Sequence, residues 1–407
     1  MRQAPTPAGA AVRARTVPTI GVEEEFLLID PHSRQLAPKG PEVCATLASA
    51  TPHAEPEMHA AQLELVTGVC HNLDELRGQL TSGRQRFARA AEENGCRLVA
   101  VGMPPVESPP VFTPKDRYAY VQETYRSVAH TSCVGGTHIH VGVDGLDDAL
   151  HACNRMRPWL PTLLALFSNS PVHNGTDTGY ASWRTIAWSR WPTTGPPPHL
   201  PDAAAYHATV EQLVHCAAGL DDGMLYWYAR PSAKWPTIEL RIADVSLTVD
   251  EELLLTALCR GLVHTALHHE PHPPATPPVP NEVLRASCWR AARYGLTGQL
   301  PHGITGRLVP AWQAVDALIA HIRPALLDAG DLPFVEQATG WLRTHGNGAQ
   351  RLREVYQRSG GDAADVVDYA IQATKGAASC LPPLSRPPGW ARRRARPRPS
   401  GGETDRQ

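Results

Sequence analysis

Residues 20–29 of the chain read IGVEEEFLLI, and this stretch says most about the fold. Side chains of a β-strand point alternately to the two faces of a sheet, so residues two apart share a face. With that period, Glu23 and Glu25 lie together on one face of a predicted strand. The opposite face is apolar and consists of Ile20, Val22, Phe26 and Leu28. Glu24 interrupts this apolar face, and the sequence alone does not explain its position.

Two later stretches repeat the pattern of one apolar and one polar face. Residues 137–143 read THIHVGV, and residues 238–242 read IELRI. The polar faces receive His138 and His140 in the first stretch and Glu239 and Arg241 in the second. Such alternation is typical of strands that pack one face on a core. We therefore predict three strands that each present two charged or titratable groups.

A fourth segment adds two acidic residues to this scheme. Within residues 62–66 the side chain of Glu64 points away from two leucines, and Glu57 precedes the segment in a predicted turn. If the polar faces converge, five carboxylates share a pocket with imidazoles and a guanidinium. Like charges so close raise one another's pKa and destabilise the fold unless cations offset them. Mg²⁺ or Mn²⁺ fits such oxygen ligands with an occasional imidazole, whereas Zn²⁺ prefers more nitrogen or sulfur.

Each polar pair also has a simpler interpretation. A Glu-x-Glu pair is often a solvated outer face of a strand, and a His-x-His pair is often structural. A Glu-x-Arg pair is often a cross-strand ion pair. The chain nevertheless repeats such pairs opposite strong aliphatic faces, and this recurrence favours one shared site.

Sequence motifs for other kinds of nucleotide or nucleophile site are missing. The chain contains no GxxxxGK[ST], GxGxxG or GxSxG motif. A P-loop, a Rossmann site and a nucleophile elbow are therefore not indicated. A nucleotide would have to be held mainly through metal ions that bridge its phosphates to the carboxylates. Arg241 suits a transferred phosphoryl group, because its planar donors match the equatorial oxygens.

Composition narrows the class of protein. The 407 residues are enough for one large domain or two closely joined ones. A formal net charge of −2 argues against a protein that binds nucleic acid by bulk electrostatic attraction. No apolar run has the roughly 18–20 residues of a membrane helix, so we expect no membrane association. The 9 cysteines include no CxxC pair, and a reducing cytoplasm is the expected location.

Three segments rich in proline are expected to lie outside regular structure. Residues 1–17 and 380–407 are predicted to be disordered tails, the second rich in arginine, and a transit peptide is the less favoured interpretation of the first. Residues 268–282 are predicted to form an extended connector before a helical C-terminal part. Residues 18–379 remain as the folded domain.

The rest of the chain predicts a mixture of helices and strands. Asn72 and Glu75 have the spacing of a helix N-terminal cap, and the helix should run toward Gly95. A short strand is predicted after it at residues 98–101. Leucine-rich helical patterns occur at residues 159–167, 251–264 and 309–327, the last interrupted or bounded by prolines. The regular strand–helix rhythm of a doubly wound parallel sheet is missing.

Six ordered segments together resemble a known family. They read TIGVEEEFLLID, LELVTGVC, GGTHIHVGV, GYASWRTIAWSRWPTTGPPP, YARPSAKWPTIELRIADV and WRAARYGL. This set is similar to the carboxylate-amine ligase branch of the glutamate-cysteine ligase type 2 family, in the glutamine synthetase-like superfamily. The resemblance implies an α+β fold with a curved, mainly antiparallel sheet and flanking helices, and it makes residues 18–379 the ligase catalytic domain. It also implies that ATP phosphorylates a carboxylate, typically the γ-carboxylate of glutamate, which an amine such as that of cysteine then attacks.

The resemblance implies roles for individual residues. Arg241 would stabilise the transferred phosphoryl group, with Glu239 beside it in the catalytic pair. Arg184 would bind the substrate carboxylate, and Arg230 would reach phosphate or substrate. The implied ligands of Mg²⁺ or Mn²⁺ are Glu23, Glu25, Glu57, Glu64, His138 and Glu239.

Departures from the family pattern leave other functions open. Many relatives have an acidic residue at the position of Ala60, and an asparagine where this chain has Ser287 and Cys288. A metal-dependent amide hydrolase would use His138, His140 and a carboxylate to activate water. A non-catalytic, metabolite-binding family member is the third alternative. The sequence identifies neither the acid nor the amine, and it leaves open whether the chain forms a homodimer.

Overall fold

The computed structural model describes residues 16–47, 53–131, 133–269 and 278–376. The predicted tails therefore lie outside the described residues, apart from Thr16 and Val17. Most of the predicted connector also lies outside them. Within the described ranges, no helix is both long and apolar enough to cross a membrane.

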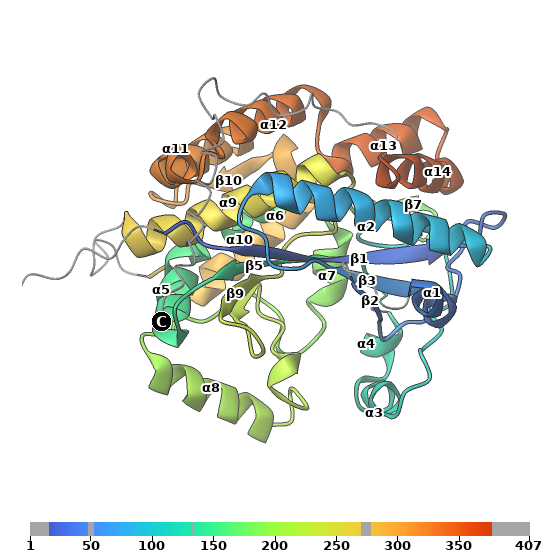
Figure 1. Ribbon diagram of the computed structural model, residues 1–407, viewed down its shortest axis with the longest axis horizontal. Helices are drawn as coiled ribbons and strands as arrows, with labels where there is room; N and C mark the ends of the chain where they lie inside the picture. Colours follow the sequence, from blue (N-terminus) through green and yellow to red (C-terminus); the bar gives the residue numbers. More distant parts are fainter. Residues whose placement is uncertain (1–15, 48–52, 132, 270–277, 377–407) are drawn as a thin grey trace, which may run out of the picture.

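A mainly antiparallel sheet forms the centre of the fold (Figure 1). Its strand order is β2-β3-β1-β5-β9-β8, and β4 pairs with the last residues of β1. All neighbouring strands in it are antiparallel, which confirms the predicted α+β class. The strands are β1 (Ile20–Ile29), β2 (His53–Pro56), β3 (Gln62–Val66), β4 (Arg97–Val99), β5 (Thr137–Gly142), β8 (Ala229–Pro231) and β9 (Thr237–Leu240). Two small hairpins pair β6 (Val172–His173) with β7 (Thr176–Asp177) and β10 (Gln299–Pro301) with β11 (Leu308–Pro310).

Helices cover the apolar face of this sheet. The helices α2 and α9 contact β1, and α9 also contacts α11 and α12 (Figure 1). In the same view, α3, α4 and α8 lie on the other side of the sheet. The helices are α1 (Gly40–Leu47), α2 (Leu73–Glu93), α3 (Asp116–Tyr125), α4 (Ser127–His130), α5 (Leu146–Met156), α6 (Leu160–Leu166), α7 (Trp183–Trp188), α8 (Ala203–His215), α9 (Val249–His268), α10 (Asn281–Tyr294), α11 (Ala311–Ala329), α12 (Leu332–His345), α13 (Gly348–Arg358) and α14 (Ala363–Thr374).

Local signals account for several helix boundaries. Asn72 caps α2 as predicted, and its side chain accepts a hydrogen bond from the backbone of Glu75. Thr248 and Glu251 form a capping box at the start of α9, a reciprocal arrangement that satisfies free backbone N–H groups. In α11, Pro310 is the N-terminal cap, but Pro324 does not end the helix. Proline removes one backbone hydrogen bond there, and packing of α11 on α9 maintains the helix beyond it.

The apolar face of β1 belongs to the main hydrophobic core. Val22, Phe26 and Leu28 are buried there with residues of α2, α9 and α11. Glu24 is also fully buried on this side, and Arg84 of α2 forms an ion pair with it. The structure thus explains the one charged residue that interrupts the apolar pattern: a guanidinium from another element neutralises it.

Candidate active site

The strand register brings the predicted polar residues together on one face of the sheet. Glu23 of β1 lies opposite His138 of β5, and His140 lies opposite Glu239 of β9. Directly opposed residues in an antiparallel sheet point to the same face. The two further pairs are Glu25 with Glu64 and Arg230 with Glu239.

These side chains line one cavity of about 390 Å³ on the face of the sheet opposite α2 and α9. The structure therefore brings together the polar faces that the strand period predicts, whereas the role of each residue stays a prediction. The predicted site residues that line the cavity are Glu23, Glu25, Glu57, Glu64, His138, Arg230, Glu239 and Arg241.

His138 lies at the centre of the acidic group. Its Nδ1 atom is 2.7 Å from a carboxylate oxygen of Glu23 and 3.9 Å from one of Glu64. Its Nε2 atom is 3.5 Å from Glu25, is buried, and has no hydrogen-bond partner among the described residues. Burial opposes ionisation of Glu23, but hydrogen bonds from His138 and His140 outweigh it and lower the pKa of Glu23. Glu23 is therefore a carboxylate at neutral pH.

Two other glutamates have raised pKa values because several acidic groups are buried close together. Burial and the neighbouring acids raise the pKa of Glu64 well above its usual value. Desolvation and the charge of Glu25 raise the pKa of Glu57 to about 7. A divalent cation would relieve both effects, since it favours the ionised form of each ligand. The donor set of carboxylate oxygens around one imidazole fits Mg²⁺ or Mn²⁺.

Two arginines share one carboxylate at the other end of the cavity. Arg230 donates from Nε to Glu239 at 2.9 Å, and it also donates to the backbone oxygen of Leu225 at 2.8 Å. Arg241 forms an ion pair with the same carboxylate, and its Nη1 atom lies 3.5 Å from Nδ1 of His138. Burial alone would raise the pKa of Glu239, but the charges of Arg241 and Arg230 outweigh it and lower that pKa. Glu239 thus fixes both guanidinium groups beside the acidic cluster.

Arg184 and Ala60 are not among the residues that line the cavity. Arg184 is buried behind Gly136, where any side chain at residue 136 would collide with its guanidinium. The backbone N–H of Gly136 in turn donates to Glu25 at 2.7 Å, so Arg184 lies next to the cavity wall. Ala60 is buried as well, and its methyl group does not reach the lining.

Some residues of the cavity are not among those that the sequence assigned to the ligase site. His140 lies 3.2 Å from Glu23 and forms a possible ligand group with Glu23 and Glu239. The strand period places His140 on the same face as His138, so the sequence does indicate that His140 lies near the site. Glu55 of β2 lies opposite Glu64 and lines the cavity too, and the charged, short β2 gives little sequence signal. Aromatic side chains complete the wall, namely Trp188, Trp191, Tyr226 and Trp235.

Glu57 gives the metal-free protein a specific pH dependence. Its folded-state pKa of about 7 exceeds its ordinary value of 4.5, so the folded state binds the extra proton between these limits. The free energy of unfolding should therefore fall as the pH rises through this window. Glu23 and Glu239, with lowered pKa values, are ionised in both states above about pH 6 and add a slope of opposite sign only below it.

Thermal unfolding in EDTA at about pH 5 and about pH 7 measures this effect. The unfolding temperature of Glu57→Gln should depend less on pH than that of the wild type, because the contribution of Glu57 is lost. Saturating Mg²⁺ should reduce the same contribution in the wild type. The same slope in wild type and Glu57→Gln would contradict the assignment of Glu57 to a strained acidic cluster.

Two solved structures with a similar fold are ligases. A glutamate–cysteine ligase from Francisella tularensis, solved in complex with AMP, aligns with a TM-score of 0.64 at 13% identity, and 89% of each chain is covered. A bifunctional glutathione synthetase from Pasteurella multocida aligns with a TM-score of 0.62 at 14% identity over 89% of this chain and 53% of that one. At 13–14% identity, these two likenesses show the class of fold to which the chain belongs.

Sequence comparison identifies the family within that class. The model of glutamate-cysteine ligase family 2 matches residues 19–369. A protein of Saccharopolyspora erythraea, provisionally named glutamate–cysteine ligase 2-1, is 48% identical over 88% of this chain and 94% of its own length. A protein of Nocardia farcinica with the same provisional name is 42% identical over 89% of this chain and 94% of its own length. The chain belongs to glutamate-cysteine ligase family 2, and it is an ATP-dependent ligase that forms carbon–nitrogen bonds.

Proposed function

We propose that this ligase joins the γ-carboxylate of glutamate, or of a closely related acid, to cysteine or another small amine. The observation that supports it best is the convergence of six glutamates and two histidines around one cavity beside Arg241. The relatives named after glutamate–cysteine ligase support the choice of acid. Both substrates are small molecules, which a cavity of about 390 Å³ suits.

The proposed ligase reaction has two steps. An oxygen of the substrate carboxylate attacks the γ-phosphorus of ATP, which forms an acyl phosphate and releases ADP. The amine nitrogen then attacks the acyl carbon, the bond from that carbon to the phosphate oxygen breaks, and inorganic phosphate leaves with the electron pair. The nitrogen loses a proton, and the product is an amide.

Roles within the cavity follow from charge and position. We assign Glu23, Glu25, Glu57, Glu64, His138 and Glu239 to the binding of Mg²⁺ or Mn²⁺. When bound, these ions would neutralise negative charge on the nucleotide phosphates. Arg241 would bind the transferred phosphoryl group, because it lies at the junction of the acidic cluster and the aromatic wall. Arg230 and Arg184 are proposed to bind phosphate or the substrate carboxylate, Arg184 from behind Gly136.

A substrate panel tests this function against the alternatives. Purified protein is incubated with ATP, Mg²⁺, glutamate and a set of amines that includes cysteine, while ADP, phosphate and the amide are followed. Phosphate release that requires both acid and amine is expected, and EDTA should abolish it. Cleavage of amides without ATP would instead indicate a hydrolase, and a lack of turnover with every pair would favour a metabolite-binding protein.

We extend the proposal to domain organisation and location. Residues 18–379 would form the catalytic domain, and the reaction would take place in a reducing cytoplasm. The cysteines within the described residues are all free thiols, which suits such a compartment. Light scattering of the purified protein would decide whether it forms the homodimer that the sequence leaves open.

A further inference from the structure

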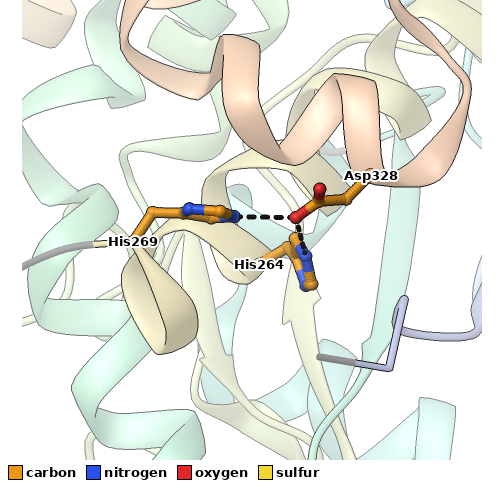
Figure 2. Close-up of side chains that lie close together, drawn as sticks. All are labelled: His264, His269 and Asp328. Atoms are coloured by element: carbon orange, nitrogen blue, oxygen red, sulfur yellow. Dashed lines mark hydrogen bonds and ion pairs between the residues drawn. The ribbon is translucent and has the colours of Figure 1, made fainter. Parts of the chain in front are cut away.

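Three potential metal ligands meet where the ends of α9 and α11 pack together. Figure 2 shows His264 of α9, His269 directly after α9, and Asp328 of α11 directed at one another. One carboxylate oxygen of Asp328 lies 3.3 Å from Nε2 of His264 and 3.0 Å from Nε2 of His269. None of the three residues lines the acidic cavity. This cluster is therefore separate from the candidate active site.

The distances between the ligand atoms fit a transition-metal site. Ligand atoms that lie about 2.0–2.1 Å from a tetrahedral zinc ion are roughly 3.3 Å from one another. The potential ligand atoms of this cluster all lie within 4.8 Å of one another, so a small closure of the side chains would suffice. Three protein ligands leave one position of a tetrahedral ion for water.

The surroundings of the cluster also favour a cation. Asp328 is the next-to-last residue of α11, and a helix C-terminus carries partial negative charge that disfavours a carboxylate. The side chain of His264 is only 1% exposed, and its Nδ1 atom is buried with no hydrogen-bond partner in the described part of the chain. Burial favours the neutral form of this imidazole, which is the form that binds a metal ion. His269 and Asp328 are more exposed, so an ion can enter from solvent.

We propose that His264, His269 and Asp328 form a second metal site that binds a divalent transition metal of the zinc type. Two imidazoles and one carboxylate favour such an ion over Mg²⁺, which prefers oxygen ligands throughout. The bound ion connects α9 of the main core to α11 of the C-terminal helices. A metal ion that binds only the folded state stabilises it, so this ion would add to the stability of the contact between the two helices.

The same distances also fit a hydrogen-bonded triad, in which an N–H group of each histidine donates to Asp328. A measurement of zinc binding distinguishes the metal site from this triad. The full chain is stripped with a chelator, supplied with Zn²⁺ in excess Mg²⁺, dialysed, and analysed for zinc per chain. Wild type should hold one zinc ion more than His269→Ala or Asp328→Asn. His215→Ala, at an exposed histidine of α8, is the matched control and should bind as the wild type does.

Two further measurements distinguish this site from the acidic cavity and from a folding defect. In His138→Ala, which removes an imidazole of the cavity, the zinc ion held by the second site should remain. Zn²⁺ should raise the unfolding temperature of wild type by a few degrees and that of the two site variants by less. With Co²⁺ in place of Zn²⁺, visible absorption typical of nitrogen and oxygen ligands should disappear in both variants.

The proposal is overturned if wild type, His269→Ala and Asp328→Asn hold the same amount of zinc. It is also overturned if Zn²⁺ shifts their unfolding temperatures equally, since the cluster would then be a hydrogen-bonded triad only. Circular dichroism of the two variants confirms that they fold. Neither variant changes the acidic cavity, so the outcome does not depend on the proposed ligase substrates.

Discussion

Replacing Arg241 by alanine should lower turnover by about 10²–10³-fold while the fold survives. Removal of one preorganised donor that stabilises developing charge commonly costs about 2.7–4 kcal/mol in the transition state. The side chain of Arg241 meets this description, because Glu239 holds its guanidinium beside His138 and the acidic cluster. Steady-state release of ADP and phosphate with saturating acid and amine gives the rate.

The partner of Arg241 should show a comparable loss. Glu239→Gln keeps the size of the side chain but removes the charge that orients both Arg241 and Arg230. Arg241→Lys should recover only part of the activity, because an ammonium group keeps the charge without the planar pair of donors.

Matched variants separate this effect from general loss of charge. Arg323→Ala removes an arginine whose ion pair with Glu336 is exposed on both sides, and it should leave turnover unchanged. Unfolding temperatures within a few degrees of wild type would show that the variants fold. Near-native turnover of Arg241→Ala would remove Arg241 from the catalytic assignment, and near-native turnover of Glu239→Gln would do the same for Glu239.

The faces of the strands could be predicted because they depend on a local period. The alternation within residues 20–29 and 137–143 sets which side chains share a face, whatever the rest of the chain does. Convergence of the polar faces then required only that these strands be neighbours, which the family resemblance implied. The register itself, with Glu23 opposite His138, is a non-local property that no short segment contains.

Ion-pair partners from distant elements could not be predicted, because they too depend on non-local packing. Arg84 lies 60 positions after Glu24 in the sequence, and nothing in the pattern of α2 marks it as the partner of a buried carboxylate. The short edge strands β2 and β8 also escaped prediction, since 4 and 3 residues are too few to establish a period. Arg184 resembled a substrate ligand by motif, but its position behind Gly136 depends on how the loop before α7 packs.

Breaking the buried ion pair between Glu24 and Arg84 should destabilise the protein by about 3–5 kcal/mol, because either residue alone is an uncompensated buried charge. Glu24 is fully buried and Arg84 is 2% exposed. Arg84 donates to Glu24 from Nε at 3.1 Å and to the backbone oxygen of Ser246 at 2.8 Å, so it also connects β1 and α2 to the segment before α9. Denaturant unfolding of Glu24→Gln and Arg84→Met measures the loss.

A double variant tests whether the loss comes from the unpaired charge. Glu24→Leu combined with Arg84→Met leaves no buried charge of the pair, so its loss should be smaller than the sum of the two single losses. Glu336→Ala, which breaks the exposed pair with Arg323, should cost less than about 1 kcal/mol and serves as the control. Single variants no worse than this control would refute a structural role for the pair. The pair also bears on the candidate site, because Glu24 anchors to α2 the strand segment from which Glu23 and Glu25 reach the cavity.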